Sequence, residues 1–195
     1  TDGGCPVLLT EPQSTNLIVQ SNDFSVSDWV KTDTSVVEGF VSPDGSSNAF
    51  KLVEDTSTSS HKIASPIVST DSESISTYSL YVKPEGRTKI GIQESQFSGK
   101  YVSFNLSTKS VISNTGLNAN IVESINGWMR IDFSQSSGGV QKKFDLYLLD
   151  DAYVSGSINA YSYTGDGTSG VLIYGGQIEE LSYATSYIPT YGAVR

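Results

Sequence analysis

The chain has 195 residues, of which 10% are aromatic and 17% are charged, and it contains 18 glycines and 11 tyrosines. This composition favours β structure over helix. Twelve basic residues against 21 acidic ones give a formal net charge of −9. Phosphate backbones repel such a surface, so we expect no nucleic-acid partner. No apolar run approaches the ~20 residues of a membrane-spanning helix, so we expect no membrane insertion.

The cysteine and histidine content limits the chemistry open to this chain. Cys5 is the single cysteine and His61 the single histidine, which excludes an intramolecular disulfide and a cysteine-based zinc site. Nothing in the sequence brings Cys5 and His61 together as a catalytic pair. Because the chain begins with Thr1 rather than methionine, we expect residues 1–195 to be one module of a longer protein.

Short segments in which apolar and polar residues alternate follow one another along the chain, and such alternation predicts strands with one buried face. Turn residues such as those of 42–45 separate the segments, and the polar stretch 54–62 is predicted to be a loop. The predicted strands are 16–20, 29–31, 35–38, 49–53, 78–83, 89–94, 101–106, 120–125, 128–133, 143–149 and 171–178. This spacing indicates an all-β sandwich or closed sheet.

The C-terminal sequence resembles a known closing signature. Segments 175–180 (GGQIEE) and 185–190 (TSYIPT) are similar to the end of jelly-roll domains in phage tail and head fibres and in bacterial surface or polysaccharide-processing proteins. Further segments match the same family in order, namely 12–18, 21–24, 78–83 and 126–130. The resemblance implies an all-β jelly-roll β-sandwich of two antiparallel sheets. It also implies an extracellular or virion-surface protein that binds glycans or holds fibres together, the latter commonly as a homotrimer.

A more distant resemblance is to carbohydrate-binding modules of families 4 and 9, carried by the opening segment 16–24 and by 48–53. Those modules are jelly rolls that often bind glycans on a concave sheet or in loops, with a structural calcium near the first strand. Ser25 stands where that family commonly has a glutamate. A calcium here would therefore depend on Asp23 and Glu179, together with backbone carbonyl oxygens. No other cofactor is expected.

The sequence lacks the patterns of common sugar-cleaving enzymes. Glycoside cleavage needs two carboxylates some ~5 to 9.5 Å apart, whereas the pairs 150–151 and 179–180 are adjacent acids that would point to opposite faces of a strand. We interpret these pairs as solvated turns or edges. A nucleophilic serine motif is absent. A lyase that uses tyrosine with histidine or arginine stays open, although no residues mark such a pair, and we expect no enzyme activity.

Strand alternation also predicts which side chains point away from the core. Leu80, Ile92, Ile131 and Leu146 are predicted to point inward and their neighbours outward. If the strands are neighbours, one outer face presents the candidate ligand-binding residues Tyr81, Gln93, Trp128, Arg130 and Tyr147. Aromatic planes flanked by amide and guanidinium donors are the groups that hold sugar rings. The alternatives are an ordinary exposed sheet and a face buried against another subunit.

Other aromatic residues are predicted to lie elsewhere. Trp29 is expected in the core. Tyr153, Tyr161 and Tyr163 lie in a polar region and are expected in a loop at one end of the sandwich, which is a second place for a ligand.

Three functions follow from these patterns. The first is a non-catalytic, lectin-like module that binds a polysaccharide or cell-surface glycan, neutral or weakly anionic because Lys83 and Arg130 would have to outweigh the net charge. The second is a structural or oligomerisation domain of a phage fibre or spike without a sugar ligand. The third is a lyase or hydrolase domain, which the absent carboxylate pattern and the lone His61 disfavour.

Overall fold

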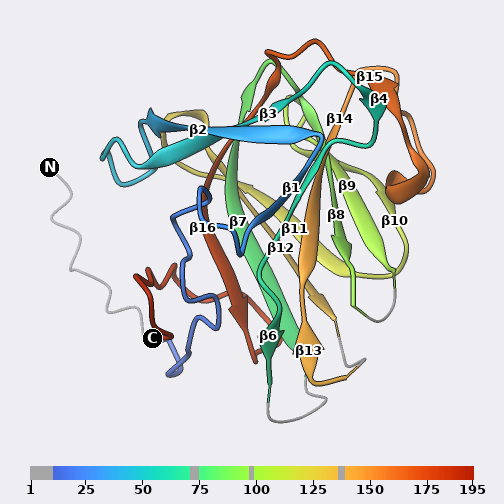
Figure 1. Cartoon of the computed structure of the whole chain (residues 1–195). Coiled ribbons are helices and arrows are strands. Elements are labelled where there is room, and N and C mark those ends of the chain that lie inside the picture. Colours follow the sequence, from blue (N-terminus) through green and yellow to red (C-terminus); the bar gives the residue numbers. More distant parts are fainter. Residues whose placement is uncertain (1–10, 71–74, 97–98, 136–138) are drawn as a thin grey trace, which may run out of the picture.

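A computed structural model describes residues 11–70, 75–96, 99–135 and 139–195, and it shows two large sheets packed face to face (Figure 1). Neighbouring strands in both sheets run antiparallel. The predicted jelly-roll β-sandwich of two antiparallel sheets is confirmed. Cys5 lies outside the described residues. In the part of the chain that is described, no helix is long and apolar enough to cross a membrane.

The strands divide into two six-stranded sheets and two short ribbons. Sheet 1 contains, in spatial order, β1 (Val30–Thr32), β5 (Lys62–Ala64), β14 (Phe144–Leu149), β8 (Lys89–Glu94), β9 (Tyr101–Asn105) and β10 (Ser110–Asn114). Sheet 2 contains β11 (Asn118–Glu123), β12 (Met129–Gln135), β7 (Ser76–Glu85), β16 (Gly170–Glu179), β3 (Ala49–Glu54) and β2 (Thr34–Phe40). The ribbons pair β13 (Gln141–Lys142) with β6 (Val68–Ser69) and β15 (Tyr163–Thr164) with β4 (Thr58–Ser59). Two short 3-10 turns are η1 (Ile125–Gly127) and η2 (Ile158–Ala160).

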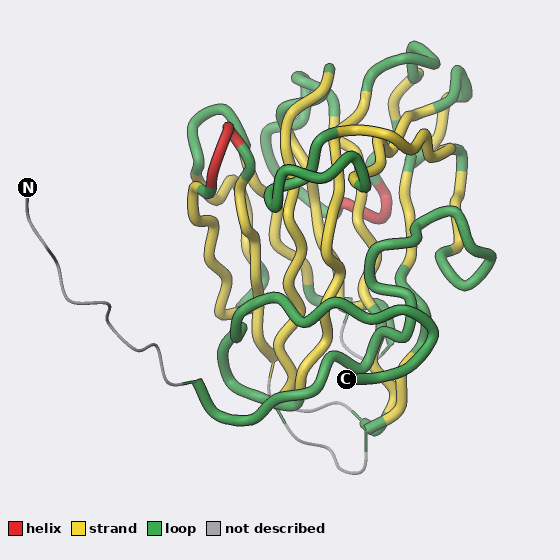
Figure 2. Tube along the Cα trace, turned by 90° about the vertical axis from the view of Figure 1, so that its left-hand side faces the viewer, coloured by secondary structure: helices red, strands yellow, loops and turns green. Residues whose placement is uncertain are grey.

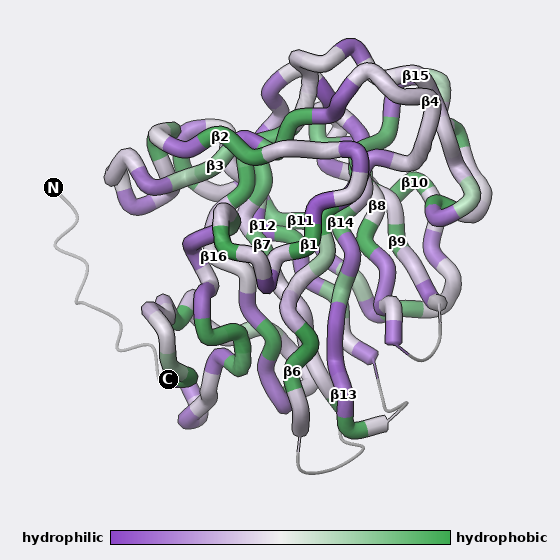
Figure 3. Tube along the Cα trace, viewed as in Figure 1, coloured by the Kyte–Doolittle hydropathy of each residue, from purple (hydrophilic) through white to green (hydrophobic). Residues whose placement is uncertain are grey.

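The inward faces of the two sheets enclose the core, as the alternation predicts. In β12, Met129, Ile131 and Phe133 are buried in the core. Hydrophobic and hydrophilic residues alternate along the strands in Figure 3. Trp29 is buried, with ring centroids 4.6 Å from Phe24 and 5.9 Å from Phe144. Its predicted core position is confirmed, and burial of such rings is a large part of the stability of a sandwich.

Two segments differ from the predicted elements. Residues 54–62 are not a simple loop, because they include β4 and the fully buried His61, and Lys62 already belongs to β5. Segment 16–20 forms no strand and meets the tail through a bridge between Gln20 and Tyr191. Its Asn16 Oδ1 accepts a hydrogen bond from the Ile18 N–H, and such local side-chain bonds compete with a strand ladder. Strands β5 and β10 of the large sheets, and all four strands of the short ribbons, are additional to those predicted.

The first described segment and the C-terminal tail run together beside the end of β16. Leu17 N donates to Ile178 O at 2.9 Å, and Asn16 N donates to Arg195 O at 2.6 Å. The Asn16 Nδ2 group donates to the carbonyls of Gly176 and Ile188. Figure 2 shows these segments as loops that cross one side of the strands. They cover the part of sheet 2 around the end of β16. The rest of the outer face is formed by the side chains of the strands themselves.

Candidate functional site

The five candidate ligand-binding residues do not share a face, so that prediction is wrong. Tyr81 and Arg130 lie opposite each other on β7 and β12 of sheet 2. Gln93 and Tyr147 lie on β8 and β14 of sheet 1. Each pair points away from the core as the alternation predicts, but the two outer faces lie on opposite sides of the sandwich.

Three of the five residues are also buried rather than exposed. Gln93 and Tyr147 are 6% and 3% exposed, because the segment around η2 covers this side of sheet 1. Ile158 packs with Tyr147 and lies so close to Gly91 that a Cβ there would stand 2.8 Å from Ile158 Cδ1. The Tyr147 hydroxyl donates to Gln93 Oε1 at 3.2 Å. This pair is therefore satisfied inside the protein.

The outer face of sheet 2 keeps the remaining candidates together. Trp128 is 1% exposed and packs against Tyr174 with centroids 6.5 Å apart. Tyr81 is half-buried beside Tyr174 and Tyr187, at 6.0 and 6.4 Å. The Arg130 guanidinium lies 5.4 Å from the centroid of the Tyr81 ring. Trp128 is thus buried among its neighbours on this face, whereas Tyr81 and Arg130 are partly exposed.

Glu179 is the centre of a buried hydrogen-bond network, so its predicted place in a solvated pair is wrong. Its Oε1 accepts from Ser14 Oγ at 2.6 Å and from Thr185 Oγ1. Its Oε2 accepts from Gln177 Nε2 at 2.6 Å and from Thr185 N at 3.2 Å. The tail covers this end of the sheet, which is why Glu179 is fully buried while Glu180 is exposed. The closing sequence motif therefore fastens both terminal segments to β16.

This network bears on the calcium that the family resemblance implies. Both Glu179 oxygens already accept two hydrogen bonds each, and Asp23 Oδ1 accepts from Ser25 N at 3.0 Å. Calcium takes six to eight oxygen ligands. Among the residues that the structure describes, no group of three or more histidine, cysteine or acidic side chains could hold a metal ion. The residues present do not fit a structural calcium, and we place none.

A second buried carboxylate, Glu54, is paired with Arg87. Arg87 donates from Nε to Glu54 Oε2 at 2.8 Å and from Nη2 to Oε1. Tyr163 Oη and Asp166 N donate to the same carboxylate at 2.7 and 2.9 Å. Burial alone would raise the pKa of Glu54, but the hydrogen bonds from Arg87 and Tyr163 outweigh it, so the pKa is lowered. This arrangement keeps Glu54 ionised inside the protein.

The same cluster holds the tyrosine, histidine and arginine that a lyase would use. The His61 ring packs against that of Tyr163 in a tilted arrangement, with centroids 4.7 Å apart, and its ring nitrogens lie 2.8 Å from Asp33 O and 3.3 Å from Tyr163 O. Tyr163 is buried in β15 rather than in an end loop. Burial and the hydrogen bond to Glu54 raise its pKa, which opposes its use as a base. The cluster has the composition of a catalytic site but the burial of a structural one.

A concave site lies beside the β2–β3 hairpin, and we call it the hairpin cleft. It has a volume of about 470 Å³. It is lined by Gln20, Asn22, Asp23, Ser25, Glu38, Gly39, Ser47, Asn48, Phe50 and Tyr191. Tyr191 is 66% exposed, and the Arg195 guanidinium lies 5.9 Å from the centroid of its ring. The cleft thus combines an exposed aromatic ring with amides, hydroxyls and two carboxylates.

Two amides of the hairpin cleft are incompletely hydrogen-bonded. Asn22 Oδ1 accepts from Gly175 N at 3.0 Å, but Asn22 Nδ2 is buried without a partner. Asn48 Oδ1 is likewise buried without a partner. Buried polar atoms in folded proteins are nearly always paired with protein, water or ligand. These two buried amide atoms are therefore the polar groups of the cleft whose hydrogen bonding is incomplete.

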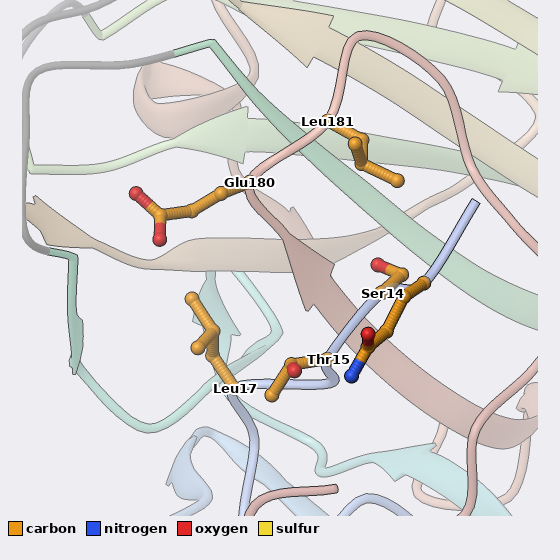
Figure 4. A pocket seen from close by; sticks show the side chains of 6 residues that line it. Ser14, Thr15, Leu17, Glu180 and Leu181 are labelled. Atoms are coloured by element: carbon orange, nitrogen blue, oxygen red, sulfur yellow. The ribbon is translucent and has the colours of Figure 1, made fainter.

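A smaller hollow lies between the first described segment and the end of β16. Its volume is about 180 Å³. Figure 4 shows Ser14, Thr15 and Leu17 on one segment and Glu180 and Leu181 on the other. Among the described residues, no aromatic ring lines this hollow, which makes it a poorer place for a sugar than the hairpin cleft.

Comparison with known proteins finds matches among solved structures alone. No family model matches it, and no curated protein matches it. One of the similar solved structures contains the CBM22-1 and GH10 modules of the N-terminal endo-1,4-beta-D-xylanase 10B from Clostridium thermocellum, complexed with xylohexaose. That match has 11% sequence identity and a TM-score of 0.44, and it covers 90% of this chain but 29% of that one. No functional argument rests on so distant a likeness. The class of the protein is given by its own strand order, a jelly-roll β-sandwich.

Most residues of the hairpin cleft were not predicted. The sequence predicts Asp23 as a calcium ligand rather than a sugar-binding residue, and it predicts Phe50 as a residue of the strand 49–53. Asn22 lies in the turn 21–24, whose clustered small polar residues are the local signal for such a site. Tyr191 is a large ring in a polar tail, and it is brought to the cleft by its bridge with Gln20.

Proposed function

We propose that this protein is a non-catalytic carbohydrate-binding module of the extracellular or virion surface, with its ligand in the hairpin cleft. The observation that carries the proposal is the exposed ring of Tyr191 beside the incompletely bonded amides of Asn22 and Asn48. A sugar ring has apolar C–H faces and a rim of hydroxyls. Tyr191 offers the plane on which such a face can stack, and the amides offer partners for the hydroxyls.

The charges of the cleft favour a neutral sugar. Asp23 and Glu38 both line it, and carboxylates accept hydrogen bonds from hydroxyl groups but repel anions. No cofactor is part of this proposal. We therefore expect binding to be the same in calcium and in a chelator.

The absence of catalysis is part of the same proposal. Its support is the burial of Tyr163 and His61 and the raised pKa of Tyr163. We expect incubation with a retained polysaccharide to release no reducing ends and no unsaturated sugars.

The test is affinity gel electrophoresis of the protein with xylan, mixed-linkage glucan, mannan and dextran, each with calcium and with EDTA. We expect retardation by at least one neutral polysaccharide. Tyr191→Ala should bind it about tenfold more weakly, because the substitution removes the ring on which the sugar stacks; a factor of ten corresponds to ~1.4 kcal/mol of binding free energy. Asn48→Ala should weaken binding in the same direction. Tyr183→Ala removes a ring that is 50% exposed outside the cleft and should bind like the parent protein.

Two results would overturn this assignment. Equal losses in Tyr191→Ala and Tyr183→Ala would place the ligand outside the cleft. Silence of the whole panel would favour the structural fibre domain, which an oligomeric-state measurement by light scattering would then test.

A further inference from the structure

Three basic side chains lie on the outer face of sheet 2, on strands β12, β7 and β3. Arg130 on β12 lies opposite Tyr81 on β7. Lys83 on β7 and Lys51 on β3 both lie opposite Leu172 of β16, one on each side of it. Adjacent strands are ~4.8 Å apart, so the two lysine Cα atoms are about 10 Å apart. We call Lys51, Lys83 and Arg130 the cationic face.

Neither lysine of the cationic face pairs with a carboxylate among the described residues, and Arg130 interacts with the carboxylate of Asp132 without direct contact. In the described part of the chain, neither Lys51, Lys83 nor Arg130 belongs to an ion pair. Arg130 Nη2 donates to Ser79 Oγ at 3.1 Å, while its Nε is buried without a partner. Asp132 is next on this side of β12, but its Oδ1 accepts from Asn120 Nδ2 at 3.0 Å. Unpaired cations are notable on a chain with a net charge of −9.

The face also carries an aromatic surface. Tyr81 is half-buried, with Arg130 over its ring at 5.4 Å. Tyr174 packs beside Tyr81 at 6.0 Å. A ring that can stack on a sugar therefore stands next to guanidinium and ammonium groups that can bind an anion. Guanidinium groups in particular match the geometry of carboxylate and sulfate oxygens.

We propose that the cationic face is a second binding site, specific for the anionic sugars of acidic polysaccharides. The carboxylate of a uronic acid or the sulfate of a sulfated sugar would lie between Arg130 and Lys83, with the sugar ring against Tyr81. Lys51 would contact the next anionic group along the chain. The inference rests on the proposed function only in taking a polysaccharide as the ligand, because its residues are separate from those of the hairpin cleft.

The experiment measures binding of three soluble polymers, polygalacturonate, dextran sulfate and neutral dextran, by affinity electrophoresis and isothermal titration at 20 mM and 500 mM NaCl. We expect at least one anionic polymer to bind at low salt and to dissociate at high salt. Lys51→Gln with Lys83→Gln should weaken this binding at least about tenfold, at roughly threefold or more for each lost charge contact. Lys109→Gln removes a cation paired with Glu123 and should change it less than twofold, the size of a small surface effect.

The controls separate this proposal from the hairpin cleft. Tyr191→Ala should leave binding of the anionic polymer unchanged, and the double lysine variant should leave binding of neutral polysaccharide unchanged. Binding of anionic polymers no tighter than that of neutral dextran would overturn the cationic face even if the cleft binds sugar. Equal losses in Lys109→Gln and in the double variant would overturn it as well, because they would show attraction to charge alone. Equal retention of a single-stranded oligonucleotide would overturn its assignment to a polysaccharide.

Discussion

Replacing Glu179 with alanine is expected to lower the free energy of unfolding by about 3–5 kcal/mol. The substitution leaves the buried donors of Gln177 and Thr185, and the half-buried hydroxyl of Ser14, without their acceptor. Hydrogen bonds to a charged group contribute about 1.5–3 kcal/mol each, and an unsatisfied buried donor costs about 1–3 kcal/mol. Equilibrium unfolding in urea, with the m-value checked for constancy, measures the loss.

Two variants make this expectation specific. Glu179→Gln keeps the shape but places an amide donor against the Thr185 N–H, so it should destabilise by less than alanine does but measurably. Glu85→Ala removes an exposed glutamate at the end of β7 and should change stability by no more than about 0.5 kcal/mol. A Glu179→Ala protein as stable as Glu85→Ala would show that the two terminal segments are not held through this carboxylate.

Replacing Arg87 with alanine is expected to cost a similar amount, about 3–5 kcal/mol, because it leaves the buried charge of Glu54 uncompensated. The Glu54 side chain is fully buried and that of Arg87 is 16% exposed. Glu54→Gln combined with Arg87→Ala should recover part of the loss, since the remaining buried group is then neutral. A double variant less stable than Arg87→Ala would show that the charge of Glu54 is held by groups other than Arg87.

The loss in Arg87→Ala should also depend on pH. The folded-state pKa of Glu54 lies below its ordinary value, which is about 4.3 in an unfolded chain. In the parent protein this stabilisation is present above that pKa and is lost as the pH falls through the lower folded value. In Arg87→Ala, protonation removes the unfavourable buried charge. The stability difference between the two proteins should therefore be largest near neutral pH and shrink as the pH falls from the raised pKa of Glu54 in Arg87→Ala toward its lowered pKa in the parent protein, measured by urea unfolding from pH 7 downward.

The alternation of residues along a strand predicted the direction of side chains but not the sheet to which the strand belongs. Ile131 and Leu146 point into the core, and Arg130 and Tyr147 point away from it, as predicted. However, β7 and β8 are consecutive in sequence and belong to opposite sheets. Sheet membership depends on pairing between distant segments, and no local pattern encodes it. The predicted five-residue face failed for this reason.

Exposure of the outer faces was the second property that the sequence did not reveal. Adjacent acids in a strand do point to opposite sides, and Glu179 does point away from the core. The tail then covers that side, so an outward residue became a buried one. The hairpin cleft has the same origin, because Asn22, Asn48 and Tyr191 come from three distant segments. Each is unremarkable in its own segment, and only the fold brings them together.

The most direct measurement is a nuclear magnetic resonance titration that follows the side-chain amide signals of Asn22, Asn48 and Gln20 as a retained neutral oligosaccharide is added. Binding in the hairpin cleft predicts saturable shifts of these signals and of the Tyr191 ring. The side-chain amide signal of Gln93, which lies on the outer side of sheet 1, should not shift. Saturable binding that leaves the Asn22, Asn48 and Tyr191 signals in place would contradict the assignment of the cleft as the sugar site.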